Sequence, residues 1–277
     1  MPELPEVETI RQTLKQLVIG KTIDSVEVMW PKIIQEPDDS HQFGQSIQHQ
    51  TIRDIRRKGK FLLFDLDQYV LVSHLRMEGK YGVHPAEEAV MDHTHVIFHF
   101  TDSTDLRYRD VRKFGTMHLQ EKGTEATKKP LLLLAKDPLE ADFSLMKFTE
   151  KVQKSERNIK NILLDQSVIA GLGNIYVDET LFLAGIHPLT KGVSLTTEQI
   201  LKIKEAAVLT LQDAVKQGGT TIRSYVNSQG QIGMFQQQLN VYAQNDKPCH
   251  HCEDTITKIK VNGRGTHYCP SCQPQPL

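Results

Sequence analysis

Residues 249–272 read CHHCEDTITKIKVNGRGTHYCPSC, with a C-x-x-C pair at each end. The two pairs lie about sixteen residues apart and contain all 4 cysteines of the chain. Four thiolates at this spacing satisfy tetrahedral Zn²⁺ and leave no open position, so we expect one structural zinc ion. The expected ligands are Cys249, Cys252, Cys269 and Cys272. A disulfide pairing is disfavoured by the cytosolic location expected below, and a redox C-x-x-C does not explain two pairs. His250 and His251 could compete as ligands, but the thiols make them unnecessary.

The residues between the cysteine pairs predict a β-hairpin. Residues 255–261 read as a strand, 262–265 as a turn with the strong Asn-Gly signal, and 266–268 as the returning strand. This places Arg264 at the tip of a hairpin that the metal holds rigid. A guanidinium presented in this way suits bidentate contact with a phosphate, although a soluble turn residue is the simpler interpretation.

Upstream of the hairpin, the pattern from Phe143 onward is helical. Apolar spacing predicts one helix from 159 to a stop at 171–173, and a second from 174 to 184 that ends at Gly185. Thr196 and Gln199 match a capping box for a long helix that closes at Gly218-Gly219. Residues 220–240 are rich in Gln, Ser and Gly, so we expect a mobile loop.

The N-terminal half predicts a helix followed by a mostly antiparallel β-sandwich that ends near Leu119. The helix covers 6–18 and stops at Gly20, and strand-like runs cover 23–29, 60–66, 69–75 and 95–100. Residues 121–138 look like a linker, in which Leu131 to Leu134 should pack. The expected fold class is therefore α+β with two domains.

Composition leaves the compartment and the partner class partly open. The 277 residues are 39% hydrophobic, and neither a membrane span nor a secretory signal is recognisable, so we expect a cytosolic protein. The net charge is −1, but two stretches are basic, and local patches on a neutral protein suit a nucleic-acid groove. For either patch alone a solvated charged face is the better interpretation. The patches comprise Arg53, Arg56, Arg57, Lys58 and Lys60, and Arg107, Arg109, Arg112 and Lys113.

Pro2 is a candidate nucleophile. Removal of Met1 would leave a secondary amine, and its attack on a sugar aldehyde carbon would give a cationic iminium. An α-amino group has a pKa near ~8, against ~10.4 for lysine, so more of it is neutral at pH 7. The alternative is that Pro2 simply starts the first helix.

Six motifs together resemble bacterial formamidopyrimidine-DNA glycosylase, and they run in order along nearly the whole chain. They are residues 2–8 (PELPEVE), 58–60 (KGK), 74–79 (HLRMEG), 112–115 (RKFG), 170–176 (AGLGNIY) and the zinc ribbon with 263–267 (GRGTH).

The resemblance implies an enzyme that removes oxidised purines and then cuts the strand at the abasic site. Pro2 would attack C1′, Glu3 would be the acid that assists base loss and ring opening, and Glu6 would position the terminus. Lys60 would serve as general acid in β-elimination and Arg264 in δ-elimination. For Glu3, capping the first helix is an alternative.

The resemblance also implies a set of DNA contacts. Met77, Arg112 and Phe114 match the family's inserted wedge, donor and stacker, although Met77 and Phe114 alone would read as core residues. Asn174 would bind phosphate unless it only caps its helix. His74 and His93 would face DNA, with His95 a second candidate for the latter position. Ser155-Glu156-Arg157 departs from the family's basic pattern, so a phosphate contact could pass to Lys154 or Arg157. Asn161 and residues 136–139 depart as well.

We therefore expect a bacterial monomer that acts on damaged duplex DNA, at the nucleoid and without a membrane partner. The expected domains are 1–120 (helix and β-sandwich), 121–142 (linker), 143–240 (helix–two-turns–helix, with a lesion-capping loop at 218–237) and 241–277 (zinc ribbon). The alternatives are an endonuclease VIII-like glycosylase for oxidised pyrimidines, and a zinc-ribbon DNA-binding protein without catalysis. The opening motif with Leu4 and the long 218–237 segment favour the purine enzyme.

Overall fold

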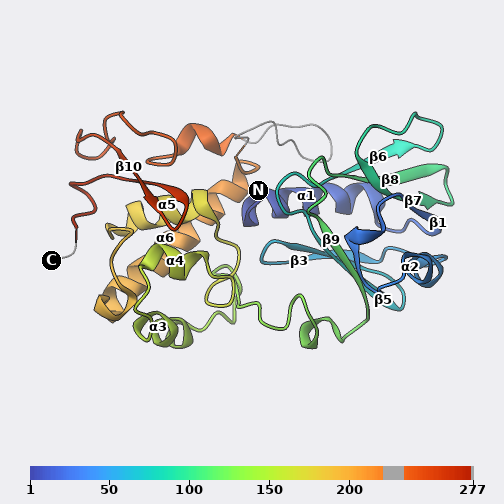
Figure 1. Cartoon of the computed structure of the whole chain (residues 1–277), viewed down its shortest axis with the longest axis horizontal. Helices are drawn as coiled ribbons and strands as arrows, with labels where there is room; N and C mark the ends of the chain where they lie inside the picture. Colours follow the sequence, from blue (N-terminus) through green and yellow to red (C-terminus); the bar gives the residue numbers. More distant parts are fainter. Residues whose placement is uncertain (221–233, 276–277) are drawn as a thin grey trace. The chain divides into compact units, whose positions relative to one another are not determined.

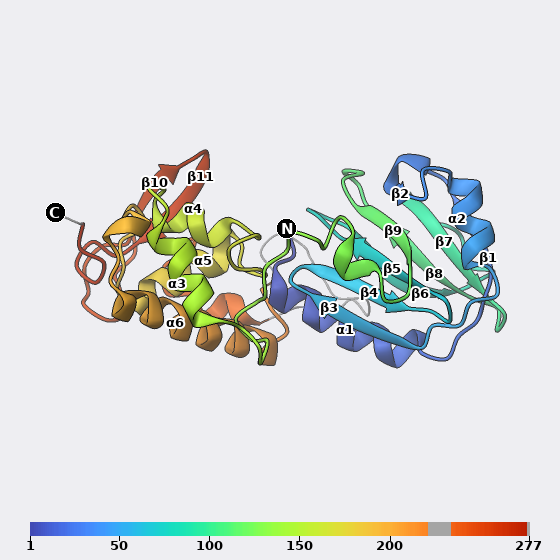
Figure 2. The ribbon, with the colours of Figure 1, turned by 90° about the horizontal axis from the view of Figure 1, so that it is seen from below.

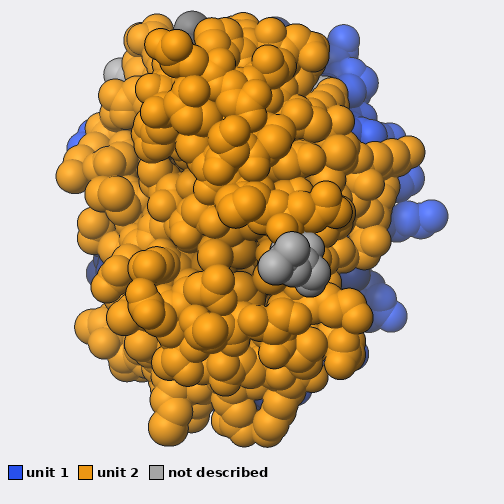
Figure 3. Space-filling model, turned by 90° about the vertical axis from the view of Figure 1, so that its left-hand side faces the viewer, with its two compact units in different colours: residues 1–2, 6–133, 221–233 blue, residues 3–5, 134–220, 234–277 orange. Residues whose placement is uncertain are grey.

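The computed structural model describes residues 1–220 and 234–275, which divide into two compact units (Figures 1 and 3). Unit 1 contains residues 1–2 and 6–133, and unit 2 contains residues 3–5, 134–220 and 234–275. Residues 221–233, most of the expected lesion-capping loop, lie outside the described residues. No helix in the described part of the chain is both long and apolar enough to cross a membrane.

Unit 1 is a β-sandwich with two helices (Figure 2). One sheet has the order β1 (Ile23–Val28), β7 (Thr94–Phe100), β8 (Thr104–Arg109), β6 (Lys80–Pro85). The other has the order β2 (Ile34–Glu36), β9 (Thr116–Glu121), β5 (Tyr69–His74), β4 (Phe61–Asp65), β3 (Asp54–Lys58). Every pairing is antiparallel except that of β2 with β9. This confirms the mostly antiparallel sandwich.

The core of unit 1 joins both sheets to the helices α1 (Leu4–Val18) and α2 (Ser40–Ile47). The α1 residues Val7, Ile10, Leu14 and Val18 are at most 1% exposed. The heptad-like spacing of these side chains gives the helix one apolar face, and burying that face fixes it on the sandwich. The helix starts two residues earlier than expected.

Unit 2 is helical, with a two-stranded hairpin near its C-terminal end. Its helices are α3 (Leu145–Gln153), α4 (Ile159–Leu164), α5 (Asn174–Ala184) and α6 (Thr197–Lys216). The predicted capping box at the start of α6 is present in full. Gly185 ends α5 in the left-handed region at φ 67°, as its position after the last apolar residue predicted.

The predicted helix over 159–171 is wrong beyond Leu164. Asp165 ends α4 because its carboxylate accepts both the backbone N–H and the hydroxyl of Ser167. These local side-chain bonds compete with the backbone hydrogen bonds that would continue the helix. Val168 and Ile169 are still buried, but they lie in a turn and not in the helix.

The hairpin is tighter than predicted. β10 (Thr257–Val261) pairs with β11 (Arg264–Tyr268), and Val261 lies opposite Arg264. The turn therefore holds only Asn262 and Gly263, at φ 45° and 77°, as a two-residue hairpin loop requires. Arg264 is the first residue of the returning strand, one position beyond the tip.

The expectation of a mobile loop over 220–240 is wrong for its last residues. Phe235 begins a short 3-10 helix and is 5% exposed, and Leu239 is 4% exposed. The Glu179 carboxylate accepts the backbone N–H groups of residues 240, 241 and 242 at 2.8–2.9 Å. In the predicted linker, Leu131 is buried as expected, but Leu132 and Leu133 are exposed.

Candidate functional site

The Glu3 carboxylate is held at the N-terminus of α5. It accepts the backbone N–H of Gly173 at 2.6 Å, that of Ile175 at 3.0 Å and that of Tyr176 at 3.4 Å. A helix N-terminus presents such unpaired N–H groups and favours negative charge. Glu3 is 3% exposed. The helix-cap alternative is thus correct in kind, but the capped helix is α5 and not α1.

Gly173 is required for this contact. A Cβ added there would lie 2.3 Å from the Glu3 Cδ, closer than any real side chain tolerates. The backbone N–H of Leu4 donates to the Gly171 carbonyl at 3.1 Å and adds a second tie next to Glu3. The Gly171-Leu172-Gly173 stretch therefore lets the backbone around Glu3 and Leu4 approach it closely.

The other N-terminal candidates are also buried. Pro2 is buried, and with Met1 attached its nitrogen belongs to an amide. Glu6 lies in the first turn of α1 and is 5% exposed. Both remain candidates for the roles that the resemblance implies.

Lys60 lies in the tight turn between β3 and β4. Lys58 pairs with Phe61, and Gly59 adopts φ 54° at the turn. The Arg57 guanidinium donates to the Gly59 carbonyl at 3.0 Å, and Lys60 is 5% exposed. A buried lysine on a fixed turn is a suitable proton carrier.

The three arginines of the first basic stretch are paired with carboxylates, some nearby along the chain and some remote. Arg56 forms a bidentate pair with Asp65, with both contacts at 2.6 Å, and also contacts Glu125. Further pairs are Arg53–Asp67 and Arg57–Glu8. For this stretch alone we favoured a solvated charged face, and the structure shows its three arginines paired with carboxylates of the protein.

The second basic stretch divides into structural and exposed members. Arg107 is 2% exposed and pairs with Asp105, and Arg109 donates to the Asp92 carbonyl. Arg112 and Lys113 are exposed. Arg112 lies 5.2 Å from the centroid of the Phe114 ring, which is 53% exposed. Met77 is 36% exposed, so neither apolar candidate is a core residue.

The histidines separate by burial. His95 is 5% exposed and bonds the Asp110 carbonyl through Nε2 at 2.8 Å, whereas His93 is exposed. His74 Nδ1 accepts the Arg76 backbone N–H at 2.9 Å, which leaves its Nε2 as the protonated nitrogen. Burial, followed by the charges of Arg76 and Lys60, lowers the pKa of His74 from 6.5 to about 3. His74 is therefore a neutral donor at pH 7.

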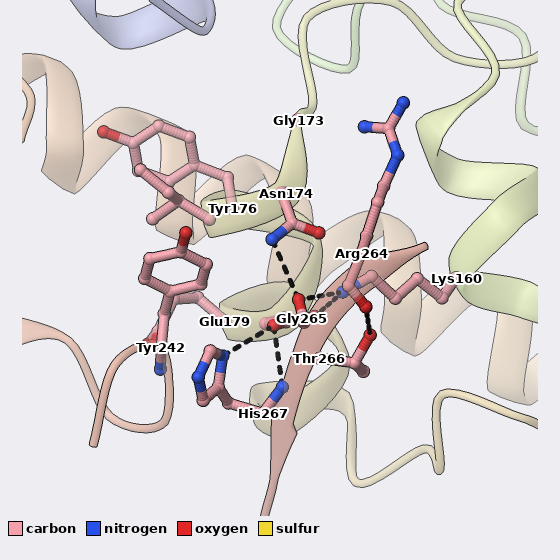
Figure 4. A network of polar contacts seen from close by, with 12 residues as sticks. Lys160, Gly173, Asn174, Tyr176, Glu179, Tyr242, Arg264, Gly265, Thr266 and His267 are labelled. Atoms are coloured by element: carbon pink, nitrogen blue, oxygen red, sulfur yellow. Dashed lines mark hydrogen bonds and ion pairs between the residues drawn. The ribbon is translucent and has the colours of Figure 1, made fainter. Parts of the chain in front are cut away.

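A buried polar network ties the zinc-ribbon hairpin to helices α4 and α5 (Figure 4). The Lys160 ammonium contacts Asp178 Oδ1 at 2.7 Å and the Gly265 carbonyl at 3.2 Å. Asp178 Oδ2 accepts the His267 backbone N–H at 2.9 Å. The Arg264 side chain extends away from this network.

Asn174 has a structural contact that sequence reasoning did not anticipate. Its side-chain amide donates to the Gly265 carbonyl at 2.9 Å, within the same network. Lys160, Asp178 and Glu179 were also missed. The signal available for them was three charged residues at positions that helical periodicity assigns to the buried face.

The two candidates near Glu156 are both exposed and paired. Lys154 contacts Glu150 at 2.5 Å, and Arg157 contacts Asp165 at 2.9 Å. Glu156 itself pairs with Lys191 at 3.4 Å. Exposed pairs of this kind are weak, so either cation is available to a phosphate.

The four cysteines converge on one point. Their Sγ atoms lie within 4.8 Å of one another, and Cys249 and Cys269 are buried. Phe182, Val241 and Ile256 pack with Cys249, Cys269 and Cys272 in a small apolar cluster. An all-thiolate set with this convergence fits tetrahedral Zn²⁺.

The chain thus combines a β-sandwich, a helical unit in which a helix N-terminus binds a carboxylate, and a hairpin flanked by four converging cysteines, which define a zinc-ribbon protein. Three family descriptions match the chain. They are the formamidopyrimidine-DNA glycosylase N-terminal domain (residues 1–117), the formamidopyrimidine-DNA glycosylase H2TH domain (134–226) and the zinc finger found in FPG and IleRS (246–275).

Relatives match over the full length. The formamidopyrimidine-DNA glycosylase of Oceanobacillus iheyensis is 57% identical over 99% of this chain and 98% of its own. That of Shouchella clausii is 56% identical over the whole of both chains. A crystal structure of a mutant Lactococcus lactis FPG with a Fapy-dG containing DNA gives a TM-score of 0.93 at 40% identity, and covers 99% of this chain and 100% of that one. The chain belongs to the formamidopyrimidine-DNA glycosylase family, and its zinc ribbon holds one structural Zn²⁺.

Proposed function

We propose that this protein is a base-excision-repair enzyme that removes oxidised purines from duplex DNA and then cuts the strand by β,δ-elimination. The observation that carries the proposal is the 57% identity to a formamidopyrimidine-DNA glycosylase over 99% of the chain. An L. lactis relative, 39% identical, was crystallised with abasic-site DNA, which supports the lyase step.

The reaction begins at Pro2 once Met1 has been removed. The free amine attacks C1′, the glycosidic bond breaks, and the departing base takes a proton. The iminium then acidifies the C2′ proton, whose loss expels the 3′ phosphate, and a second elimination expels the 5′ phosphate. Glu3 supplies the proton that assists base loss and ring opening, and Glu6 positions the terminus. Lys60 serves the first elimination and Arg264 the second.

The DNA is held around the extruded nucleotide. Met77 fills the space that the base leaves, Arg112 donates to the opposite base and Phe114 stacks. The exposure of Phe114, and the Arg112 guanidinium 5.2 Å from the centroid of its ring, support this assignment. His74, His93, Asn174 and either Lys154 or Arg157 contact the DNA.

Zinc performs no step in this chemistry. Cys249, Cys252, Cys269 and Cys272 hold it, and the bound ion fixes the hairpin from which Arg264 extends. We also propose the domain limits 1–120, 121–142, 143–240 and 241–277, and a monomer that acts in the bacterial cytoplasm at the nucleoid.

Two measurements test the proposal. Release of 8-oxoguanine from a duplex should greatly exceed release of thymine glycol, and the reverse preference would indicate the endonuclease VIII-like alternative. Borohydride should trap the enzyme on abasic DNA, which a binding protein without catalysis cannot do. Pro2→Gly should sharply reduce trapping. Unchanged trapping would refute Pro2 and point to Lys60 or another amine, and intact mass establishes whether Met1 is absent.

A further inference from the structure

We infer that Asp110 is a positioning residue that shapes the 112–115 loop before DNA arrives, so that Arg112 and Phe114 are presented ready to enter the duplex. The inference rests on the proposed function, because that function gives Arg112 and Phe114 their task. It concerns a residue that does not itself reach the DNA, since Asp110 is 0% exposed.

The Asp110 carboxylate organises the loop through backbone donors alone. Oδ1 accepts the N–H of Arg112 at 3.0 Å, and Oδ2 accepts the N–H groups of Phe114 and Gly115 at 2.9 Å each. The Asp110 carbonyl accepts the N–H of Lys113 at 3.2 Å. One residue thus binds four consecutive backbone N–H groups, and these bonds hold Lys113 in the left-handed region at φ 58°.

The backbone of Asp110 also connects the 112–115 loop to His93 and His95. Its N–H donates to the His93 carbonyl at 3.0 Å, and its carbonyl bonds His95 Nε2 at 2.8 Å. The loop and His93, both proposed to contact DNA, therefore share one anchor.

The Tyr108 side chain contacts both the 112–115 loop, at Gly115, and the loop that carries Met77, at Gly79. A Cβ at Gly115 would lie 1.8 Å from the Tyr108 hydroxyl oxygen, and a Cβ at Gly79 would lie 2.2 Å from it. Both glycines are thus pressed against one buried phenol, which packs edge-on against Tyr81 at 5.0 Å. The three side chains proposed to enter the duplex, Met77, Arg112 and Phe114, therefore extend from two loops that both pack against Tyr108.

The contact between Lys113 and Trp30 allows the conformation of the loop to be followed by fluorescence. Its ammonium nitrogen lies 4.1 Å from the ring centroid of Trp30, and Trp30 is the only tryptophan of the chain. A cation this close to an indole face alters its environment, so Trp30 fluorescence reads the loop in the free protein, without DNA.

The test uses Asp110→Asn in the full-length zinc-loaded protein. The amide keeps the size of the side chain, but whichever way it turns, an NH₂ group faces a backbone N–H. We expect Trp30 emission and acrylamide quenching to shift toward those of Lys113→Met, which removes the ammonium directly. The matched control is Asp102→Asn, which removes an aspartate that caps an exposed turn at Thr104. Wild-type Trp30 spectra in Asp110→Asn would overturn the inference.

The kinetic arm compares two substrates. Release of 8-oxoguanine from a duplex needs the loop, whereas strand cleavage at an abasic site in single-stranded DNA leaves no opposite base to contact. Asp110→Asn should reduce the first rate at least tenfold more than the second. Equal losses on both substrates indicate general damage to the fold and contradict the inference.

A second variant covers the case in which Asp110→Asn does not fold. Gly115→Ala leaves the carboxylate intact but forces a methyl group against Tyr108, and it should give the same substrate pattern. Gly44→Ala is its control, because the added Cβ meets only the Val26 carbonyl at 3.9 Å. A wild-type pattern in Gly115→Ala refutes a preset loop. If wild-type protein neither releases 8-oxoguanine nor traps on DNA, the proposed function fails, and the Trp30 measurement still decides the role of Asp110.

Discussion

Lys160 and Asp178 form a 2.7 Å ion pair in which both side chains are completely buried. Burial lowers the pKa of Lys160, and the charge of Asp178 opposes that shift. The pair joins α4 to α5, and each partner also bonds the hairpin strand β11, through the Gly265 carbonyl and the His267 N–H. The placement of Arg264 therefore depends on an ion pair that does not contact it.

Removing one member of this pair should be costly. Lys160→Met leaves an uncompensated buried carboxylate, and we expect a loss of about 3–5 kcal/mol in the free energy of unfolding, measured by urea denaturation with circular dichroism. Lys202→Ala is the control, since its pair with Glu198 is exposed and worth less than about 0.5 kcal/mol. A Lys160→Met variant as stable as Lys202→Ala would contradict the importance of the pair.

Gly173→Ala should displace Glu3, the proposed acid, without unfolding the protein. The new methyl group must displace the Glu3 carboxylate, which lies 2.3 Å from its position. We expect base release to fall at least as far as in Glu3→Gln, with a melting temperature close to that of wild type. The measurement is single-turnover 8-oxoguanine release, and wild-type rates in Gly173→Ala would show that the carboxylate need not be where the structure places it.

His74 should make unit 1 less stable in mild acid. In the folded protein the pKa of His74 is about 3, below the ordinary 6.5. Below pH 6.5, His74 therefore binds a proton in the unfolded chain but stays neutral in the folded chain. Stability then falls as the pH falls, by about 1.4 kcal/mol per pH unit, or about 2 kcal/mol between pH 6.5 and 5.

Trp30 fluorescence in urea measures this effect, because Trp30 and His74 belong to the same unit. His74→Gln should lower stability at pH 7.5 but lose about 2 kcal/mol of the pH dependence. His41→Gln, at an exposed position, should keep the wild-type pH dependence. An identical pH dependence in His74→Gln would exclude His74 as its source.

Chelation should remove the zinc and the function together. We expect one Zn²⁺ per chain, thiols that react slowly while it is bound, and four reactive thiols after chelation. DNA cleavage should disappear and return when zinc is added. Zinc-free protein that retains cleavage, with a mass reduced by disulfide formation, would favour the disulfide alternative.

The sequence predicted best those features whose cause is local. The cysteine spacing predicted the metal site, and the Thr196–Gln199 capping box predicted the start of α6, because short-range chemistry determines both. Local competition that was overlooked produced the main error, since the Asp165 side chain ends α4 through Ser167.

Long-range partners could not be predicted. The Arg53 to Lys60 stretch looks like a free basic patch, yet its arginines meet carboxylates from α1 and from other strands and turns. Asp110 could have been suspected as a turn-forming aspartate before a left-handed residue, but its four backbone contacts exist only in the folded loop. The family resemblance implied roles on DNA for particular residues, but it did not point to Asp110 or to the Lys160–Asp178 pair, which position them.

The three donors to Glu3 belong to the main chain and not to side chains. Exchange of the side chain at Ile175 or Tyr176 therefore cannot delete a donor, and only proline, which has no N–H, can do so. Most point mutations therefore leave the three donors to this carboxylate in place. The sensitive position is Gly173, where an added side chain would displace the carboxylate itself.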